Sequence, residues 1–235
     1  MGFAMASIYE DLLGQCIYEN PLASASDLAG FQAEGDAGFS FPLGRLRLEG
    51  TRDPGEGQAA NLVVWCPEEF PDHIHISWDY RAIQDPGLSI LFFAAKGANG
   101  EDVLDPALSP RNGPYDQYHS GDINALHVSY FRRKHPIERA FNVCNLRKSH
   151  GFHLVAQGAD PIPGVPNMKA SYRIWLIKSG PHVRFGIDGL ECFQWTDTGA
   201  LGPVLTGGKI GFRQMTPLIA EYSQLKVHQL KQPLG

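Results

Sequence analysis

Imidazole, guanidinium and amide side chains recur at every second position in three segments of this chain, residues 73–81, 125–133 and 141–147. Imidazole groups exchange protons near neutral pH, and guanidinium and amide groups bind carboxylates through paired hydrogen bonds. In an extended strand, every second side chain points to the same face of the sheet. The alternation therefore predicts three polar rows, which form a floor for a sugar ring if the strands are neighbours.

These rows, together with the loop 97–120 and the segments 152–157 and 209–215, supply candidates for each part of a lyase site, in which a sugar that carries a carboxylate is broken by β-elimination. The reaction needs donors that neutralise the carboxylate, a base that removes the adjacent proton, and an acid for the leaving oxygen. The candidate base is His127 or His75, and the candidate acid is Tyr118 or Tyr130. The candidate substrate-binding residues are Asn145, Arg147, His153, Arg213, Asp79 and Tyr115.

Other interpretations of the same residues stay open. A glycoside hydrolase needs two carboxylates at a set separation, and the scattered acidic residues offer Asp79 with Asp122 or with Glu221. A non-catalytic carbohydrate-binding module needs the polar floor but no histidine with a shifted pKa. Alternating polar residues also describe an ordinary solvated sheet face. The charge run 132–139 is interpreted as a solvated hairpin tip.

The sequence predicts no catalytic metal and no bound organic cofactor. His73 with His75, and His150 with His153, have spacings compatible with metal ligation. No cysteine or acidic residue at a diagnostic spacing completes either pair. The glycine-rich nucleotide-binding motifs, the GxSxG motif and the HExxH motif are absent from the sequence.

The charge balance and apolar content predict a compact globular protein. The 235 residues carry a formal net charge of −5, and 43% of them are hydrophobic. We expect no nucleic-acid or membrane partner, because both favour a basic surface and no segment is long and apolar enough to span a bilayer. The first fifteen residues lack a secretion signal, and the cysteines are too widely spaced for a disulfide framework. We therefore expect a cytoplasmic protein with four buried, unpaired thiols.

Many short apolar or alternating runs, separated by 26 glycines and 17 prolines, predict an all-β fold in one domain, residues 1–235. Two hairpin turns are indicated, at Ser179-Gly180-Pro181 and at Asp188-Gly189. Residues 8–16 fit a helical turn or a leading strand equally well, and the long loops 97–120 and 158–171 are expected to form binding rims. The predicted strands are 44–50, 61–67, 73–81, 88–96, 125–133, 141–147, 152–157, 172–180, 182–188, 209–215 and 222–230.

Longer motifs in the chain resemble the YesU-type family of uncharacterised proteins. They include VVWCPEEFPDHIHISWDY, YHSGDINALHVSYFRRK, ERAFNVCNLRKS, GFHLVAQGADPIP and GPVLTGGKIGFRQMTPLIAEYSQLKVH. The similarity extends from about Ile17 to His228. It implies a concanavalin-like and galectin-like jelly roll, a sandwich of two antiparallel sheets.

The resemblance also implies a ligand class. The family is associated with the use of rhamnogalacturonan, so the expected partner is a short, acidic, uronate-containing oligosaccharide. A local basic groove on an acidic protein would attract such anions. Jelly rolls often carry a structural Ca²⁺ between a sheet and the termini, and we include this ion as an expectation. Lyase-type β-elimination is the function expected first, and hydrolysis or non-catalytic binding are the alternatives.

Overall fold

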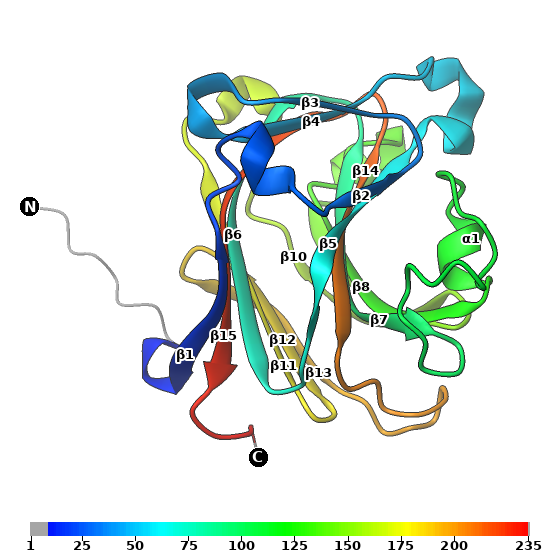
Figure 1. Cartoon of the computed structure of the whole chain (residues 1–235). Coiled ribbons are helices and arrows are strands. Elements are labelled where there is room, and N and C mark those ends of the chain that lie inside the picture. The colour runs from blue at the N-terminus through cyan, green and yellow to red at the C-terminus, as the bar shows by residue number, and fades with distance from the viewer. Residues whose placement is uncertain (1–8, 235) are drawn as a thin grey trace, which may run out of the picture.

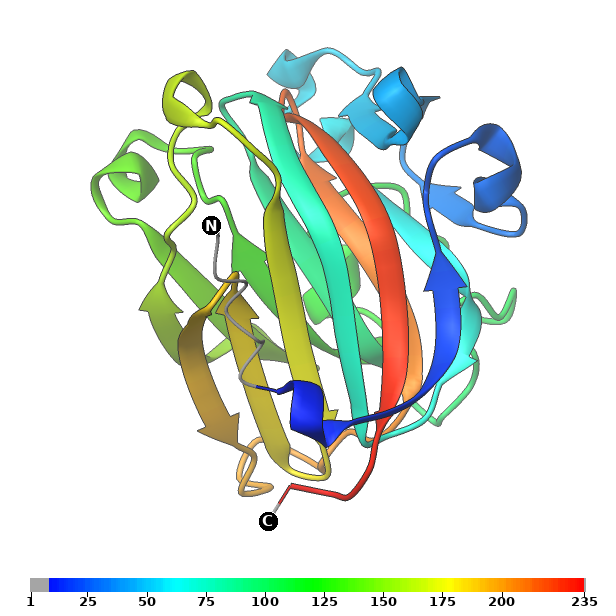
Figure 2. The ribbon, with the colours of Figure 1, turned by 90° about the vertical axis from the view of Figure 1, so that its left-hand side faces the viewer.

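The computed structural model describes residues 9–234, apart from the side chain of Arg139, and consists of two antiparallel β-sheets packed face to face (Figure 1). In sheet A the strand order is β13-β12-β11-β6-β15-β4-β3, and β1 also pairs with β15. In sheet B the order is β10-β9-β8-β7-β14-β5-β2. Figure 2 shows sheet A face on, with β6 and the long β15 at its centre. The predicted jelly-roll sandwich is confirmed.

The elements have the following bounds. In sheet A they are β13 (Leu190–Thr196), β12 (His182–Ile187), β11 (Tyr172–Ser179), β6 (Ile74–Gln84), β15 (Ile219–Leu230), β4 (Leu46–Gly50), β3 (Ala37–Ser40) and β1 (Leu13–Asn20). In sheet B they are β10 (His153–Ala159), β9 (Val143–Ser149), β8 (Ile123–Tyr130), β7 (Leu88–Gly97), β14 (Gly208–Met215), β5 (Leu62–Phe70) and β2 (Gln32–Glu34). The helices are α1 (Asp116–His119) and α2 (Pro136–Ala140), with short 3₁₀ turns η1 (Glu10–Leu12), η2 (Ala25–Leu28), η3 (Pro42–Gly44), η4 (Pro54–Ala60) and η5 (Val165–Asn167).

Each predicted strand corresponds to a strand of the structure, and both predicted hairpins form. Ser179 pairs with His182 across the first turn, and Ile187 pairs with Leu190 across the second, where Asp188 has a φ of 51°. The prediction missed β2, β3 and β13 and left the start of β1 open between a strand and a helical turn, because the residues of these strands are largely half-buried or exposed and lack a clear apolar period. Within residues 8–16, for which the sequence left a helical turn and a strand open, η1 leads into β1. Ile8 lies outside the described residues.

The core lies between the sheets and is rich in aromatic rings. Trp78 of β6 and Tyr130 of β8 face each other across it, and the Trp78 indole N–H donates to the Tyr130 hydroxyl at 3.2 Å. Tyr80 and Tyr222 from sheet A pack against the same cluster, with ring centroids 5.5 Å apart. Since both inner faces are filled by packed side chains, any ligand site must lie on an outer face of the sandwich.

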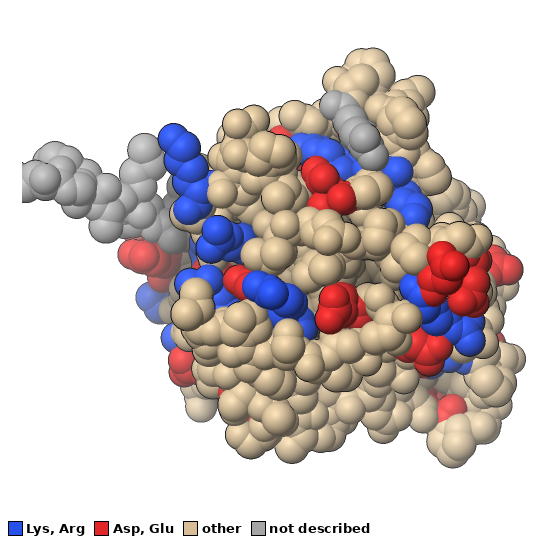
Figure 3. All heavy atoms as spheres, turned by 90° about the horizontal axis from the view of Figure 1, so that it is seen from above, with Lys and Arg blue, Asp and Glu red and all other residues tan. Residues whose placement is uncertain are grey.

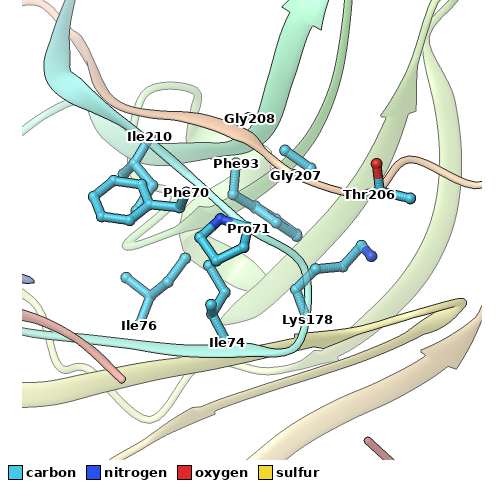
Figure 4. Close-up of a pocket in the computed structure, with 11 residues that line it drawn as sticks. Phe70, Pro71, Ile74, Ile76, Phe93, Lys178, Thr206, Gly207, Gly208 and Ile210 are labelled. Atoms are coloured by element: carbon cyan, nitrogen blue, oxygen red, sulfur yellow. The ribbon is translucent and has the colours of Figure 1, made fainter. Parts of the chain in front are cut away.

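Two buried lysines close one end of the sandwich, and each has a carboxylate partner. Lys148 Nζ lies 2.7 Å from Asp197 Oδ2, and Lys178 Nζ lies 2.9 Å from Asp72 Oδ1. Figure 4 shows Lys178 next to Ile74, with Phe70 on the opposite side of a small cavity that these residues line. The cavity has a volume of about 10 Å³ and holds at most one water molecule, so it is not a binding site.

The cysteine prediction was correct for two residues and wrong for the other two. Cys66 and Cys144 are buried, whereas Cys16 is exposed and Cys192 is half-buried. All four thiols are free. Cys16 lies on β1, which the sequence pattern left open, and Cys192 lies on β13, which it did not reveal.

Charged side chains are mixed on the molecular surface. Seen from above, basic and acidic residues lie beside one another and leave large uncharged areas between them (Figure 3). A broad basic stripe, the footprint of a nucleic-acid-binding protein, is not present on this face. In residues 9–234, no helix has the length and apolar character needed to cross a membrane.

We predict that the buried Lys148–Asp197 ion pair contributes far more to stability than an exposed pair. Asp197→Asn leaves the Lys148 ammonium buried without its counter-charge, so the free energy of unfolding should fall by about 3 kcal/mol. Asp36→Asn, which removes the exposed partner of Arg52, is the matched control and should cost less than about 1 kcal/mol. Urea unfolding measures both values, and equal losses would contradict the prediction.

Candidate functional site

The outer face of sheet B carries two rows of functional side chains that the strand register places side by side. One row runs from Arg213 of β14 through Ile90 and Ser129 to Asn145 of β9. The next row contains Phe92, His127 and Arg147. The predicted polar floor therefore exists on β8 and β9, and Arg213 extends it across β7 to β14.

The segment that leads into α1 covers this floor with two tyrosine rings. The guanidinium carbon of Arg213 lies 4.7 Å from the centre of the Tyr115 ring and 5.1 Å from that of Tyr118. Tyr118 also packs against Phe92 of the floor, with ring centroids 5.6 Å apart. Arg213 is thus held between two aromatic faces by cation–π contacts.

The Arg213 guanidinium is fully buried and forms no ion pair among the described residues, although the carboxylates of Glu34 and Asp116 favour its charge at longer range. Its side chain is 0% exposed, and Nη2 lies 3.2 Å from the amide oxygen of Gln58. Nε and Nη1 have no hydrogen-bond partner among the residues that the structure describes. Buried charges are normally paired and fully hydrogen-bonded, so Arg213 is an exception that calls for an explanation.

A cavity of about 200 Å³ opens on this face of sheet B. Arg213 does not line it, but two of its contacts, Gln58 and Tyr115, do. The apolar wall of the cavity is formed by Leu88, Ile90 and Met215. Its polar wall and rim are formed by Gln58, Tyr115, Ser129, Arg132, His135, Glu138, Asn145, Arg147 and Phe152. The cavity is therefore lined by an apolar patch on one side and by guanidinium, amide and hydroxyl groups on the other, as sugar sites require.

Arg147 is held in place at the rim by a single neighbour. Its Nη1 donates to the backbone oxygen of Phe152 at 3.0 Å, and its guanidinium carbon lies 3.7 Å above the centre of the Phe152 ring. Tyr115 packs edge-on against the same ring at 5.5 Å. The Arg147 charge is thus oriented before any ligand arrives, which reduces the entropy lost on binding.

Arg132 shares the rim with one acidic side chain. Its Nη2 forms an ion pair of 2.9 Å with Glu138, and its Nη1 lies 3.1 Å from the amide group of Asn145. Arg132 and Glu138 are both largely buried. Arg132 and Arg147 line the cavity together with one carboxylate among the described lining residues, and Arg213 lies behind Tyr115. The charged side chains that line the cavity therefore leave a net positive local charge.

A chain of hydrogen bonds fixes the direction of the protons around His127. The Ser149 hydroxyl donates to the Gly151 carbonyl at 3.1 Å, so its oxygen is free to accept from His127 Nε2–H at 3.1 Å. His127 Nδ1 must then be the acceptor in the 2.7 Å bond with Tyr115. The Tyr115 phenol therefore donates its proton to His127.

Burial keeps both members of this pair uncharged. Desolvation, reinforced by the nearby Arg147, lowers the pKa of the fully buried His127 well below 6.5. Desolvation raises the pKa of Tyr115 to about 12, although Arg213, Arg147 and Arg132 oppose the shift by favouring a phenolate. Tyr115 is the member that lines the cavity, since His127 is 1% exposed and lies behind it.

The structure brings together five of the predicted site residues. Four of them, His127, Asn145, Arg147 and Arg213, lie on the outer face of sheet B, and Tyr115 covers them. Tyr118 lies below Tyr115 and contacts Arg213 but does not line the cavity.

The other four predicted residues lie elsewhere. The prediction that Tyr130 is the acid is wrong, because its side chain points to the inner face of β8 and is buried in the core. His153 pairs with Lys148, so its side chain lies on the face of β10 opposite to the one beside Arg147. His75 and Asp79 belong to β6, which pairs with β11 and β15 in sheet A.

On sheet A, His75 and Asp79 have other surroundings. Burial and the neighbouring His228 lower the pKa of His75 to about 4. Asp79 forms an ion pair of 3.1 Å with Arg173. The expectation that His75 and Asp79 share a floor with His127 is wrong. The alternation of side chains along a strand shows which residues share a face, but it does not reveal which sheet the strand joins.

The carboxylates expected for a hydrolase are not assembled at the cavity. Asp79 is on sheet A, and Glu221 is there too, held by Arg45 and Arg47. Asp122 accepts a hydrogen bond of 2.6 Å from the backbone of Ser109, outside the cavity lining.

The sequence interpretation missed Arg132, His135 and Glu138, which line the cavity. The charge run that contains them was expected to be a solvated hairpin tip, but it forms the turn into α2 and α2 itself. Phe131 has a φ of 47°, which ends the alternation of β8 and turns Arg132 towards the outer face. A positive φ at phenylalanine has no signal in the sequence.

The calcium ion stays a prediction. Within residues 9–234, no three histidine, cysteine or acidic side chains gather closely enough to share a metal ion. Calcium also uses backbone and water oxygens, so this arrangement supplies no dedicated side-chain cage for it.

Comparison with known proteins shows close and distant relatives. The chain is 53% identical over 217 residues to the uncharacterised protein YesU of Bacillus subtilis (strain 168), covering 92% of this chain and 96% of that protein. A crystal structure of a protein of unknown function with a galectin-like fold, from Bacillus subtilis, has a TM-score of 0.89 at 52% identity and covers 93% of this chain and 97% of that one. The carbohydrate-binding module CBM66 from Bacillus subtilis has a TM-score of 0.52 at 12% identity, with 85% and 95% covered, and shares the fold.

The family assignment rests on nearly the whole sandwich and not on a local motif. Residues 15–227 match the family described as a domain of unknown function, DUF1961. That range runs from β1 into β15 and includes every residue of the cavity described above. This chain belongs to the DUF1961 family.

Proposed function

We propose that this chain binds the acidic end of a short, uronate-containing oligosaccharide in the cavity of sheet B. The observation that carries the proposal is Arg213, a buried guanidinium with two unpartnered nitrogens that lies directly behind the cavity-lining residues Tyr115 and Gln58. A carboxylate reaches it when one of these two side chains moves aside. A sugar carboxylate supplies the missing counter-charge and accepts the missing hydrogen bonds. The fold that this chain shares with a carbohydrate-binding module is consistent with the proposal.

The size of the cavity favours a small part of the ligand. Its volume of about 200 Å³ lies below the roughly 300–1,000 Å³ of sites that enclose drug-sized molecules. We therefore propose that one sugar residue enters and that its neighbours lie over the rim formed by Phe152, Arg132 and α2. The apolar wall of Leu88, Ile90 and Met215 takes the C–H face of the ring, while Asn145 and Arg147 bond to its oxygens.

We further propose that the bound uronate is broken by β-elimination. The proton on the carbon beside the carboxylate is removed, its electron pair forms a carbon–carbon double bond, and the bond to the leaving oxygen breaks as that oxygen takes a proton. The guanidinium groups neutralise the carboxylate and so acidify the proton. Tyr115, the cavity-lining member of the pair with His127, gives its proton to the leaving oxygen and takes the one from carbon, so it ends unchanged.

Non-catalytic binding is the second candidate, and one observation favours it. Tyr115 has its pKa raised to about 12 and stays protonated near neutral pH, which suits a hydrogen-bond donor better than a base. Hydrolysis is less well supported, because Glu138 is the one carboxylate among the described lining residues and is already paired with Arg132.

Arg213→Met tests the binding proposal. The substitution keeps an unbranched, apolar stem and removes the charged guanidinium group, so affinity for a uronate disaccharide should fall about 10- to 100-fold, the loss of a charged hydrogen bond. Because an unpaired buried charge is removed, the free energy of unfolding should stay equal or rise. Calorimetry with the uronate disaccharide and its neutral counterpart gives the affinities.

Arg173→Met, which removes a guanidinium from sheet A, is the matched control and should leave the affinity unchanged. Equal affinity of wild type for the acidic and the neutral disaccharide would refute the proposal. So would unchanged binding by Arg213→Met.

Tyr115→Phe separates β-elimination from binding alone. Wild type should produce the ultraviolet absorbance of an unsaturated uronate from pectic, glucuronan or ulvan-type oligosaccharides, and the variant should bind the disaccharide but lose turnover. If no substrate gives an unsaturated product with wild type while Arg213-dependent binding is present, the protein is a binding module.

His127 should stay neutral through the physiological range. We expect its ring signals in NMR spectra to remain constant from pH 8 down to pH 5, with His127→Gln used for assignment, because its pKa lies well below 6.5. An unfolded chain takes up a proton as the pH falls through about 6.5, so folding stability should drop by about 1.4 kcal/mol per pH unit below that point. His127→Gln should remove this contribution to the dependence of folding stability on pH. An NMR titration midpoint near pH 6.5 for His127 would contradict the prediction that it stays neutral.

A further inference from the structure

The thiols of Cys144 and Cys192 meet where the edges of the two sheets come together. Cys144 lies on β9 of sheet B and is 0% exposed, and Cys192 lies on β13, the edge strand of sheet A. Cys192 packs against the core cluster that contains Cys144, and after burial its thiol is the next cause that raises the pKa of the Cys144 thiol, so the two side chains are neighbours. Both are free, so this contact joins two reduced sulfurs.

A glycine allows the two strands to approach so closely. Gly158 of β10 is the register partner of Cys144. A Cβ atom at Gly158 would lie 1.9 Å from the backbone oxygen of Cys192, which is closer than any real side chain can come. The missing side chain thus lets β13 lie directly on β10, and this places Cys192 beside Cys144.

The other two cysteines have different surroundings. The Cys66 thiol is buried and in hydrogen-bond contact with the Tyr18 phenol. Cys16 is exposed on β1, and its thiol lies 3.4 Å from the backbone oxygen of Tyr18. The Cys66 contact also joins sheet B to sheet A, but its partner is a phenol, whereas Cys144 has a second thiol as its neighbour.

We propose that Cys144 and Cys192 are a modification site, at which a small oxidised disulfide such as glutathione disulfide closes an inter-sheet disulfide bond. The half-buried Cys192, as a thiolate, attacks one sulfur of the reagent and releases one molecule of reduced thiol. Cys144 then loses its proton and attacks the sulfur of Cys192, which releases the second. Two protein thiols are oxidised to one disulfide, and one reagent disulfide is reduced to two thiols.

The order of attack follows from exposure. Cys192 is accessible to a reagent in solution, whereas Cys144 is enclosed. Burial raises the pKa of the Cys144 thiol well above 9, so the second attack is the slow step. The mixed disulfide on Cys192 is accordingly the intermediate that accumulates first.

The cross-link would act on the strand that carries part of the cavity. Cys144 directly precedes Asn145 in β9, so the bond ties this strand to the opposite sheet. It also closes a long loop of the unfolded chain and thereby removes conformational freedom from the unfolded state. Oxidised protein should therefore be the more stable form.

The test uses the full chain with Cys16→Ser, which removes the exposed thiol. Purified protein is incubated with glutathione disulfide or with reduced glutathione, and intact mass and peptide mapping follow. We expect the loss of two hydrogens and one cross-linked peptide pair containing Cys144 and Cys192, and a melting temperature higher by roughly 5–10 °C.

Cys192→Ser in the same background is the matched control, because a half-buried position tolerates the change. It should give neither the cross-link nor the higher melting temperature. A glutathione adduct that persists on Cys192 without a cross-link would overturn the proposal, and so would a cross-link that involves Cys66 or a second chain. Cys144→Ser should instead trap that adduct on Cys192.

Discussion

The guanidinium of Arg213 is a positive charge held inside the protein without an ion pair among the described residues, and the site on sheet B is organised around that constraint. Removing a charge from water is costly unless other groups compensate for it. Here two tyrosine faces and the oxygen of Gln58 compensate in part. The covering segment that bears Tyr115 and Tyr118 therefore does two things at once: it shields the charge from water, and it brings the Tyr115 phenol to His127.

The period of two residues in a strand explains which parts of this arrangement the sequence predicts. It correctly groups Asn145 with Arg147 and separates both from Cys144 and Leu146, because these residues alternate within one regular strand. It does not reveal that β6 joins the other sheet, and so it wrongly places His75 beside His127. It also fails at Phe131, where one residue of positive φ sends Arg132 to the cavity instead of Arg133. The alternation of side chains is a local property of each strand, whereas the pairing of strands and the irregular backbone at their ends depend on the whole fold.

The rim depends on contacts that are distant in sequence, and for that reason no spacing rule identifies it. Arg147 is oriented by Phe152 from the turn before β10, and Tyr115 is oriented by His127 from β8. The covering segment is anchored at Arg111, whose guanidinium bonds to Glu34 at the end of β2 at 2.7 Å. Since β2 is one of the strands without an apolar period, both the anchor and the position of the tyrosines follow from tertiary structure.

The buried cations of this protein differ in one respect that bears on function. Lys148 and Lys178 lie at one end of the sandwich, and each has a carboxylate within 3 Å. The cavity that Lys178 lines holds at most one water molecule. Lys209 is also buried, and it too is paired with a carboxylate, that of Asp102. Arg213 differs from these lysines in having no ion pair among the described residues, and under the proposed function an acidic ligand in the cavity lined by its neighbours Tyr115 and Gln58 supplies the counter-charge.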